Sequence, residues 1–281
     1  MKKYLSLVTF AHTVFALPFA LLSAVLAAQG LPALPTLLWI LVAMVGARSA
    51  AMAFNRIADR TLDAENPRTR SRDIPAGRVS LVEASMFCAL SAGVFVFAAW
   101  RLNPLCLALS PVALVVVLGY SYTKRVTALS HVVLGLGLAI APVGAWIAVT
   151  GAFALLPVVL GLSVLFWVAG FDVIYSLQDE EFDRAHGLFS LPARLGARRA
   201  LAISTAFHAV SLTLLFLAFV LADGGIPFGL GVVLAGVFLV RQHVLVKPGD
   251  LSRVDGAFFT ANGWLSVAVF ACGAADVFLR R

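Results

Sequence analysis

Nine long apolar runs dominate the sequence, and short polar segments separate them. They cover approximately residues 5–28, 33–54, 80–100, 104–120, 130–149, 153–176, 199–221, 226–243 and 257–278. A helix of about 20 apolar residues crosses the hydrocarbon core of a bilayer. Continuous runs exclude soluble sheets, and an outer-membrane barrel would show alternation instead. The pattern predicts an all-α fold, a polytopic membrane bundle of nine transmembrane helices.

Charge orients this bundle. The 281 residues are 61% hydrophobic and only 12% charged, with a net charge of +7. If the N-terminus is cytoplasmic, 17 Lys and Arg residues fall on the internal side, and only Arg101, Arg280 and Arg281 fall outside. This positive-inside bias predicts the cell inner (cytoplasmic) membrane, with the C-terminus external. It accounts for the net charge without nucleic acid. No second domain is evident, so residues 1–281 are expected to form a single domain.

The acidic residues concentrate in two segments at the internal ends of apolar runs. In "FNRIADRTLD", Asn55, Asp59 and Asp63 are spaced i, i+4, i+8. In "FDVIYSLQDEEFD", Asp172, Tyr175, Asp179 and Asp183 are spaced i, i+3, i+7, i+11. Each set shares one helix face, and both lie at the same membrane surface. The two acidic stripes are therefore expected to meet across one cavity.

Converging carboxylates repel one another unless cations lie between them, and hard oxygen ligands suit Mg²⁺, which bridges phosphate oxygens. Basic side chains that could bind the same phosphate are nearby: Arg60, Arg68, Arg70, Arg72, and Lys124 and Arg125 in "YSYTKR". The alternative is that acids and bases simply pair at the headgroup level. The repeated carboxylate spacing favours a metal-bridged diphosphate.

The chain resembles the UbiA superfamily of intramembrane prenyltransferases. "NRIADRTLD" is similar to its first motif, Asn-Asp-x-x-Asp-x-x-x-Asp, and "YSLQDEEFD" to its second, Asp-x-x-x-Asp after a Tyr. "RTRSRDIPAG" and "YSYTKR" also match, and the segments occur in family order. Three positions depart from the pattern: Arg56 replaces an Asp, and Asp73 and Ser121 each replace a Pro. Arg56 either brings a direct phosphate contact or points outward.

The resemblance implies a Mg²⁺-dependent transfer of a polyprenyl group from a polyprenyl diphosphate. One Mg²⁺ is expected on Asn55, Asp59 and Asp63, and another on Asp179 and Asp183. The expected diphosphate-binding residues are Arg60, Arg68, Arg72, Tyr120, Lys124 and Arg125. Aromatic faces stabilise an allylic cation, which makes cavity-wall candidates of Phe10, Phe15, Phe19, Tyr120, Tyr122, Phe171 and Tyr175.

The acceptor must be electron-rich at carbon. Asp172 matches a family Asp that orients or deprotonates the acceptor hydroxyl, so Asp172 and Tyr175 are the catalytic candidates. Resemblance is closest to bacterial 4-hydroxybenzoate polyprenyltransferase-like proteins, including the futalosine-pathway menaquinone type. It implies 4-hydroxybenzoate for ubiquinone or 1,4-dihydroxy-6-naphthoate for menaquinone. Arg48 is a candidate for binding the acceptor carboxylate or the diphosphate, and His12 is a candidate for binding the acceptor.

Three alternatives stay open. Another enzyme of the superfamily, such as haem farnesyltransferase or chlorophyll synthase, differs in its acceptor. A secondary transporter with an acidic ion site would place its acids near the midplane in interrupted half-repeats. A CDP-alcohol phosphotransferase would carry its aspartates in one contiguous signature, whereas these two stripes lie more than 100 residues apart.

Overall fold

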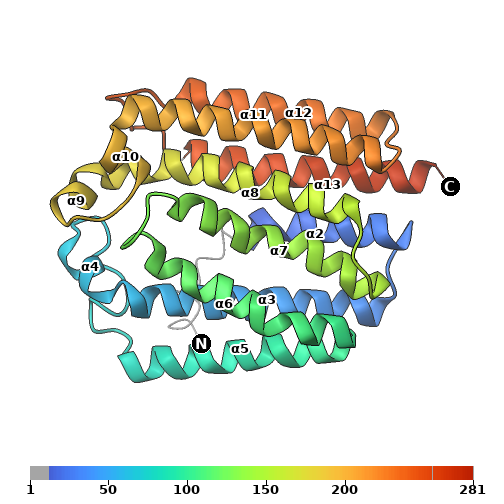
Figure 1. The fold of residues 1–281 in the computed structure, drawn as a ribbon, viewed down its shortest axis with the longest axis horizontal. Helices are drawn as coiled ribbons and strands as arrows, with labels where there is room; N and C mark the ends of the chain where they lie inside the picture. Colours follow the sequence, from blue (N-terminus) through green and yellow to red (C-terminus); the bar gives the residue numbers. More distant parts are fainter. Residues whose placement is uncertain (1–12, 255, 281) are drawn as a thin grey trace.

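The computed structural model describes residues 13–254 and 256–280, and these residues form helices and connecting loops without a β-strand (Figure 1). The all-α class is confirmed. The long helices are α2 (Thr13–Ala28), α3 (Leu34–Ala58), α5 (Leu81–Leu102), α6 (Pro104–Thr123), α7 (Ser130–Thr150), α8 (Leu155–Ser176), α11 (Ala197–Leu221), α12 (Ile226–Leu245) and α13 (Asn262–Leu279).

Eight apolar helices of the described residues are long enough to cross a membrane, and a shorter one covers Phe15–Ala28. The expected count of nine spans is therefore not confirmed, because the first run begins before the described residues. The outer faces of these helices carry exposed apolar side chains, including Val115 of α6 and Val233 of α12. Such a surface is stable in lipid rather than in water.

Short polar signals set the helix boundaries. Ser80 and Glu83 form a reciprocal capping box at the start of α5. The Asn103 side chain accepts a hydrogen bond from the Cys106 backbone and donates one to the Ile147 carbonyl, at 2.9 and 2.8 Å. It thereby fixes the α5–α6 turn and ties it to the end of α7.

Helix α8 is buried along most of its length and organises the bundle, since α7 and α11 both pack against it. The approach of α7 depends on Gly135, where a Cβ would lie 2.3 Å from the Leu165 carbonyl oxygen of α8. Trp167 of α8 is fully buried, with the Phe15 and Phe19 rings of α2 packed against it. These contacts hold α7 and α2 against α8.

One end of the bundle carries short elements that lack counterparts at the other end. They are α4 (Arg60–Glu65) after α3, a 3₁₀ turn (Leu177–Asp179) and α9 (Glu180–Ala185) after α8, and α10 (Leu191–Leu195). Helices α4, α9 and α10 gather at the left of Figure 1. The Phe189 backbone N–H donates to the Lys124 carbonyl at 2.7 Å, which ties the loop before α10 to the end of α6.

Candidate active site

A pocket of ≈ 270 Å³ opens at this end of the bundle, among the ends of α3, α6, α7 and α8. Most of the site residues expected from the sequence line it: Arg48, Asn55, Asp59, Asp63, Arg68, Arg72, Tyr120, Lys124, Asp172, Tyr175, Asp179 and Asp183. The two acidic segments, far apart in the sequence, therefore face one cavity.

The first acidic segment is buried and bound to basic side chains. Asp59 and Asp63 are only 3% and 4% exposed. Asp59 accepts hydrogen bonds from Asn55 Nδ2 at 3.0 Å and Lys124 Nζ at 2.8 Å. Asp63 Oδ1 accepts one from Arg72 Nη1 at 2.6 Å. Each carboxylate thus has a cationic side chain as its partner in the pocket wall.

The second acidic segment is joined to the loop that follows the first. Arg68 Nε and Asn66 Nδ2 both donate to Asp179 Oδ1, at 2.9 and 3.0 Å. Arg68 Nη1 also donates to the Tyr175 hydroxyl at 3.1 Å. Burial opposes the charge of Arg68, but the hydrogen bond and the charge of Asp179 outweigh it and raise the pKa of Arg68.

In this structure the acids and bases of the pocket pair with one another, as the alternative of simple acid–base pairing at the headgroup level predicts. Among the described residues, no three His, Cys, Asp or Glu side chains converge closely enough to hold a metal ion by themselves. The donor chemistry nevertheless fits Mg²⁺, which takes carboxylate and amide oxygens together with waters and phosphate oxygens. Asp63 Oδ2 is buried without a hydrogen-bond partner among the described residues, and such an atom is costly unless it acquires a ligand. The residues present therefore fit a divalent cation.

Asp172 lies deeper in the pocket and pairs with a residue that the sequence reasoning missed. His131, in the first turn of α7, places Nδ1 2.7 Å from Asp172 Oδ2. The sequence offered one signal, a His at the start of an apolar run directly after "YSYTKR". A lone His has no spacing relation to Asp172, so only the packing of α7 on α8 reveals the pair.

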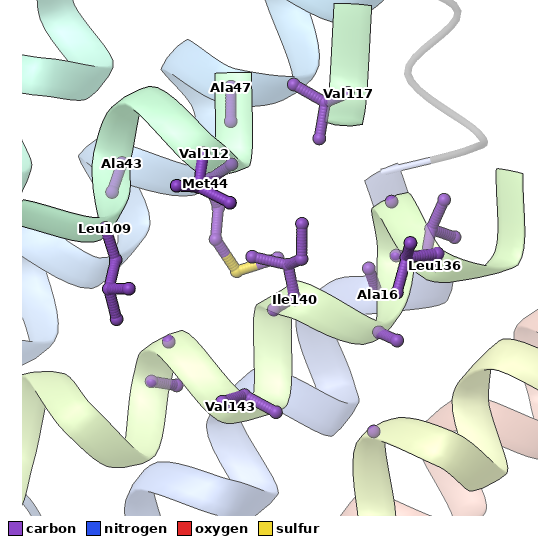
Figure 2. A pocket seen from close by; sticks show the side chains of 18 of the residues that line it. Ala16, Ala43, Met44, Ala47, Leu109, Val112, Val117, Leu136, Ile140 and Val143 are labelled. Atoms are coloured by element: carbon purple, nitrogen blue, oxygen red, sulfur yellow. The ribbon is translucent and has the colours of Figure 1, made fainter. Parts of the chain in front are cut away.

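A second, apolar cavity of ≈ 430 Å³ adjoins the polar pocket, and Arg48, Tyr120, Leu134 and Leu138 line both. Apolar side chains of α3, α6 and α7 form its wall, including Met44, Leu109 and Ile140 (Figure 2). Arg48 lies at the junction. Its Nε is buried without a hydrogen-bond partner among the described residues. A guanidinium whose Nε is buried and unpaired among the described residues marks a position where an anionic group would be stabilised.

Several other sequence candidates are placed elsewhere. Arg60 is exposed and donates to the Ile57 carbonyl at 3.1 Å, and Arg125 donates to Asp59 Oδ1 at 3.2 Å from outside the pocket lining. Tyr122 is about half exposed and does not line the pocket. Phe19 is buried in the core against Trp167. His12 and Phe10 lie outside the described residues.

The three departures from the family pattern also have clear positions. Arg56 lines the pocket, with Nη1 3.5 Å from Asn55 Oδ1, and does not point outward. Asp73 is buried and accepts a hydrogen bond from Arg78 Nε at 2.7 Å. The Ser121 hydroxyl is buried without a partner among the described residues. Arg56 therefore adds a positive charge to the pocket beside Asn55, whereas Asp73 stabilises the loop before α5.

Comparison with known proteins agrees with this geometry. The model of the UbiA prenyltransferase family matches residues 16–265. A 4-hydroxybenzoate octaprenyltransferase of Shewanella frigidimarina (strain NCIMB 400) is 32% identical over 257 residues, covering 91% of this chain and 89% of the relative. The apo structure of a UbiA homolog from Aeropyrum pernix K1 is 34% identical with a TM-score of 0.82, covering 96% of this chain and 98% of that one.

A third comparison bears on the fold alone. The structure of a UbiA homolog from Archaeoglobus fulgidus bound to DMAPP and Mg²⁺ has a TM-score of 0.79 at 20% identity, and it covers 99% of both chains. The helical arrangement is therefore shared even where few residues are identical.

Proposed function

Because the chain belongs to the UbiA prenyltransferase family, we propose that this multi-pass membrane enzyme transfers a polyprenyl group from a polyprenyl diphosphate to an aromatic carboxylate. The acceptor is 4-hydroxybenzoate or 1,4-dihydroxy-6-naphthoate, and the product enters ubiquinone or menaquinone biosynthesis. The resemblance inferred from the motifs is confirmed at the level of family and enzyme class. The acceptor and the pathway belong to the proposal.

One observation supports the proposal most directly. The charged pocket adjoins the apolar cavity, and Arg48 and Tyr120 line both. A polyprenyl diphosphate has a strongly charged head and a long hydrocarbon chain. Its head fits among the acids and bases, and its chain fits in the ≈ 430 Å³ cavity between α3, α6 and α7. An ion transporter has no need of the apolar cavity.

The basic side chains bind the diphosphate. Arg68, Arg72 and Lys124 line the pocket, each paired with an acid. Arg56 adds a further guanidinium. Asn55, Asp59, Asp63, Asp179 and Asp183 would hold Mg²⁺, which supplies charge neutralisation of the departing diphosphate. The Archaeoglobus fulgidus homolog of the same fold is bound to DMAPP and Mg²⁺, which supports the choice of a prenyl diphosphate and Mg²⁺ as the ligands. The cations that now neutralise the carboxylates are then available to phosphate oxygens.

Asp172 handles the acceptor proton. Its carboxylate takes the proton of the acceptor hydroxyl, which makes the ring more electron-rich. The allylic C–O bond of the donor breaks, its electron pair leaves with the diphosphate, and a ring carbon bonds to the prenyl C1. The resulting dienone then loses its ring proton to water, and Asp172 returns a proton to the oxygen. The aromatic faces of Tyr120, Phe171 and Tyr175 line this space and stabilise positive charge at the allylic carbon.

Arg48 selects an acceptor that carries a carboxylate. Its guanidinium is buried at the inner end of the pocket, and its Nε lacks a partner among the described residues. A carboxylate on the aromatic ring would supply the missing charge and hydrogen bonds. Asp172 and Arg48 line the same pocket, so one aromatic ring can bind Asp172 through its hydroxyl and Arg48 through its carboxylate.

The positive-inside distribution supports placing this end of the bundle on the cytoplasmic side of the inner membrane, with the N-terminus cytoplasmic and the C-terminus external. The soluble acceptor then reaches the site from the cytoplasm, and the prenyl donor from the lipid. Both substrates meet at the membrane surface.

The test is product formation by the purified protein in detergent, with Mg²⁺, a polyprenyl diphosphate and each acceptor in turn, read by mass spectrometry. A prenylated product from one acceptor supports the proposal and identifies the pathway. Diphosphate release without either product indicates another acceptor within the family. Neither product nor diphosphate release, with both acceptors and with added Mg²⁺, contradicts prenyl transfer and revives the transporter alternative.

A further inference from the structure

We propose that His131 is a positioning residue that holds the Asp172 carboxylate in place for the acceptor hydroxyl. The inference rests on the proposed function, because it assigns a role within that reaction. Each of the two ring nitrogens of His131 has a hydrogen-bond partner, and the two partners belong to different helices.

The hydrogen bonds of His131 define its tautomer. The Leu191 backbone N–H, at the start of α10, donates to His131 Nε2 at 3.3 Å. A backbone N–H can only donate, so Nε2 must be the nitrogen with the free lone pair. In the neutral ring the hydrogen then lies on Nδ1, which is 2.7 Å from Asp172 Oδ2. His131 therefore donates to the carboxylate and accepts from α10.

This arrangement leaves one oxygen of Asp172 for the substrate. Oδ2 is bound to His131, which is only 3% exposed. Oδ1 accepts no hydrogen bond from any described side chain or backbone group, and the Asp172 side chain is 23% exposed in the pocket. A donor that holds one oxygen of a carboxylate in this way sets the orientation of the carboxylate and keeps it a hydrogen-bond acceptor. The free Oδ1 is the oxygen that meets the hydroxyl proton.

The same histidine also links three elements, α7, α8 and α10. The segment between α8 and α10 includes α9, which carries Asp183, so a purely structural role for His131 in holding this segment is the competing explanation. The two hydrogen bonds of His131 can be separated by substitution, which makes the two roles distinguishable.

The substitutions His131→Asn and His131→Gln form a matched pair. The Asn amide places its nitrogen near the position of Nδ1 and can donate to Asp172, but it does not reach Leu191. The longer Gln amide reaches the position of Nε2 and can accept from Leu191, but it offers nothing to Asp172. Positioning of Asp172 predicts that Asn retains much of the turnover, whereas Gln loses about 10- to 100-fold in kcat, as happens when a hydrogen bond that orients a functional side chain is removed. The KM for the prenyl donor should stay unchanged in both.

A double-mutant cycle with Asp172→Asn isolates the coupling. If His131 acts through Asp172, His131→Gln has no further effect on kcat once Asp172 is an amide. Equal losses in both backgrounds, or a His131→Asn enzyme no more active than His131→Gln, would overturn the inference. The melting temperature of each variant shows whether the bundle stays folded.

A readout without turnover separates this inference from the proposed function. ¹⁵N spectra of histidine-labelled protein, with the His131 signal assigned by its absence from His131→Asn, report which ring nitrogen carries the hydrogen. The expected result is a hydrogen on Nδ1 and none on Nε2. A hydrogen on Nε2 refutes the positioning role, even in an active enzyme. A wild-type protein that forms no prenylated product but shows the expected tautomer refutes the proposed reaction instead.

Discussion

Arg68 Nε lies 2.9 Å from Asp179 Oδ1, although 111 residues separate the two in the sequence. The ion pair joins the loop after α4 to the turn after α8, so the two acidic motifs form the walls of one pocket. Asp179 also receives a hydrogen bond from Asn66, which belongs to the same loop as Arg68. The Asp179 carboxylate therefore accepts hydrogen bonds from several donors, and a bound metal–diphosphate complex would change these contacts.

Replacing Asp179 by Asn is expected to lower prenyl transfer at least about 100-fold, because an amide neither carries the charge that a divalent cation needs nor pairs with Arg68. Glu181→Gln is the matched control, since Glu181 lies two residues away in α9 and is exposed. The initial rate of product formation checks both. Wild-type turnover by Asp179→Asn would remove this residue from the site.

Asp63→Asn tests the metal directly. Asp63 Oδ2 is buried and has no hydrogen-bond partner in the part of the chain that the structure describes, so the amide variant should need about 10- to 100-fold more Mg²⁺ for half-maximal activity. EDTA should abolish wild-type activity, and added Mg²⁺ should restore it. Asp250→Asn, at an exposed loop carboxylate that bonds to Ser252, serves as the control. An unchanged Mg²⁺ dependence in Asp63→Asn would exclude Asp63 as a ligand.

The sequence predicted the helices well because membrane spans leave a long, continuous signal. It also predicted which acids share a face, since the i, i+4 spacing of Asp59 and Asp63 survives the short break between α3 and α4. The same spacing is no guide for the basic residues, because Arg68 and Arg72 are also four residues apart but lie in a loop and not in a helix. Arg60 follows Asp59 immediately and therefore points about 100° away on a helix. Arg68 and Arg72 reach the pocket only through the fold of the intervening loop.

His131 shows a different limit of sequence reasoning. Its partner, Asp172, is 41 residues distant, and nothing in the local sequence relates them. The pair forms because α7 approaches α8 closely at glycine positions. The apolar cavity could not be predicted from the sequence either, because its lining residues resemble any other residues of a membrane span. Only the structure shows that they surround a cavity between α3, α6 and α7.

Arg48→Leu is expected to raise the KM for a carboxylate-bearing acceptor about 10- to 100-fold, by removing a charge-assisted hydrogen bond. With an acceptor that lacks a carboxylate, for example 1,4-dihydroxynaphthalene, the KM of the same variant should differ little from that of the wild type. Steady-state kinetics with 1,4-dihydroxy-6-naphthoate and this analogue measure the difference. An equal loss with both acceptors would show that Arg48 binds the diphosphate or supports the fold, and not the acceptor carboxylate.

Ala47→Phe should restrict the length of the prenyl chain. Ala47 lies in the wall of the apolar cavity, between Met44 and Arg48 of α3 (Figure 2). A phenyl ring there fills space that a long chain needs, so kcat/KM should fall for a long polyprenyl diphosphate more than for a short one. Val45→Phe, on the lipid-facing side of the same helix at 57% exposure, is the control. A uniform loss for all donors would contradict placement of the chain in this cavity.

Gly135→Ala should destabilise the bundle, although alanine is the better helix former. Its Cβ would lie 2.3 Å from the Leu165 carbonyl oxygen, so α7 and α8 must move apart, and such overpacking costs about 1–3 kcal/mol. Gly137→Ala is a close control, because its Cβ would meet only a Val117 methyl group at 3.8 Å. Thermal unfolding in detergent should show a lower melting temperature for the first variant alone.

Gly135→Ala should also lower the rate of prenyl transfer. His131 lies one turn before Gly135 on α7, so separation of the two helices lengthens its hydrogen bond to Asp172. Prenyl transfer by Gly135→Ala should fall even at temperatures where the protein stays folded. Gly93→Ala of α5, whose Cβ would meet no atom within 4 Å and which lines neither cavity, should keep the wild-type rate. A destabilised Gly135→Ala enzyme with full activity below its melting temperature would show that the chemistry does not depend on close packing of α7 on α8.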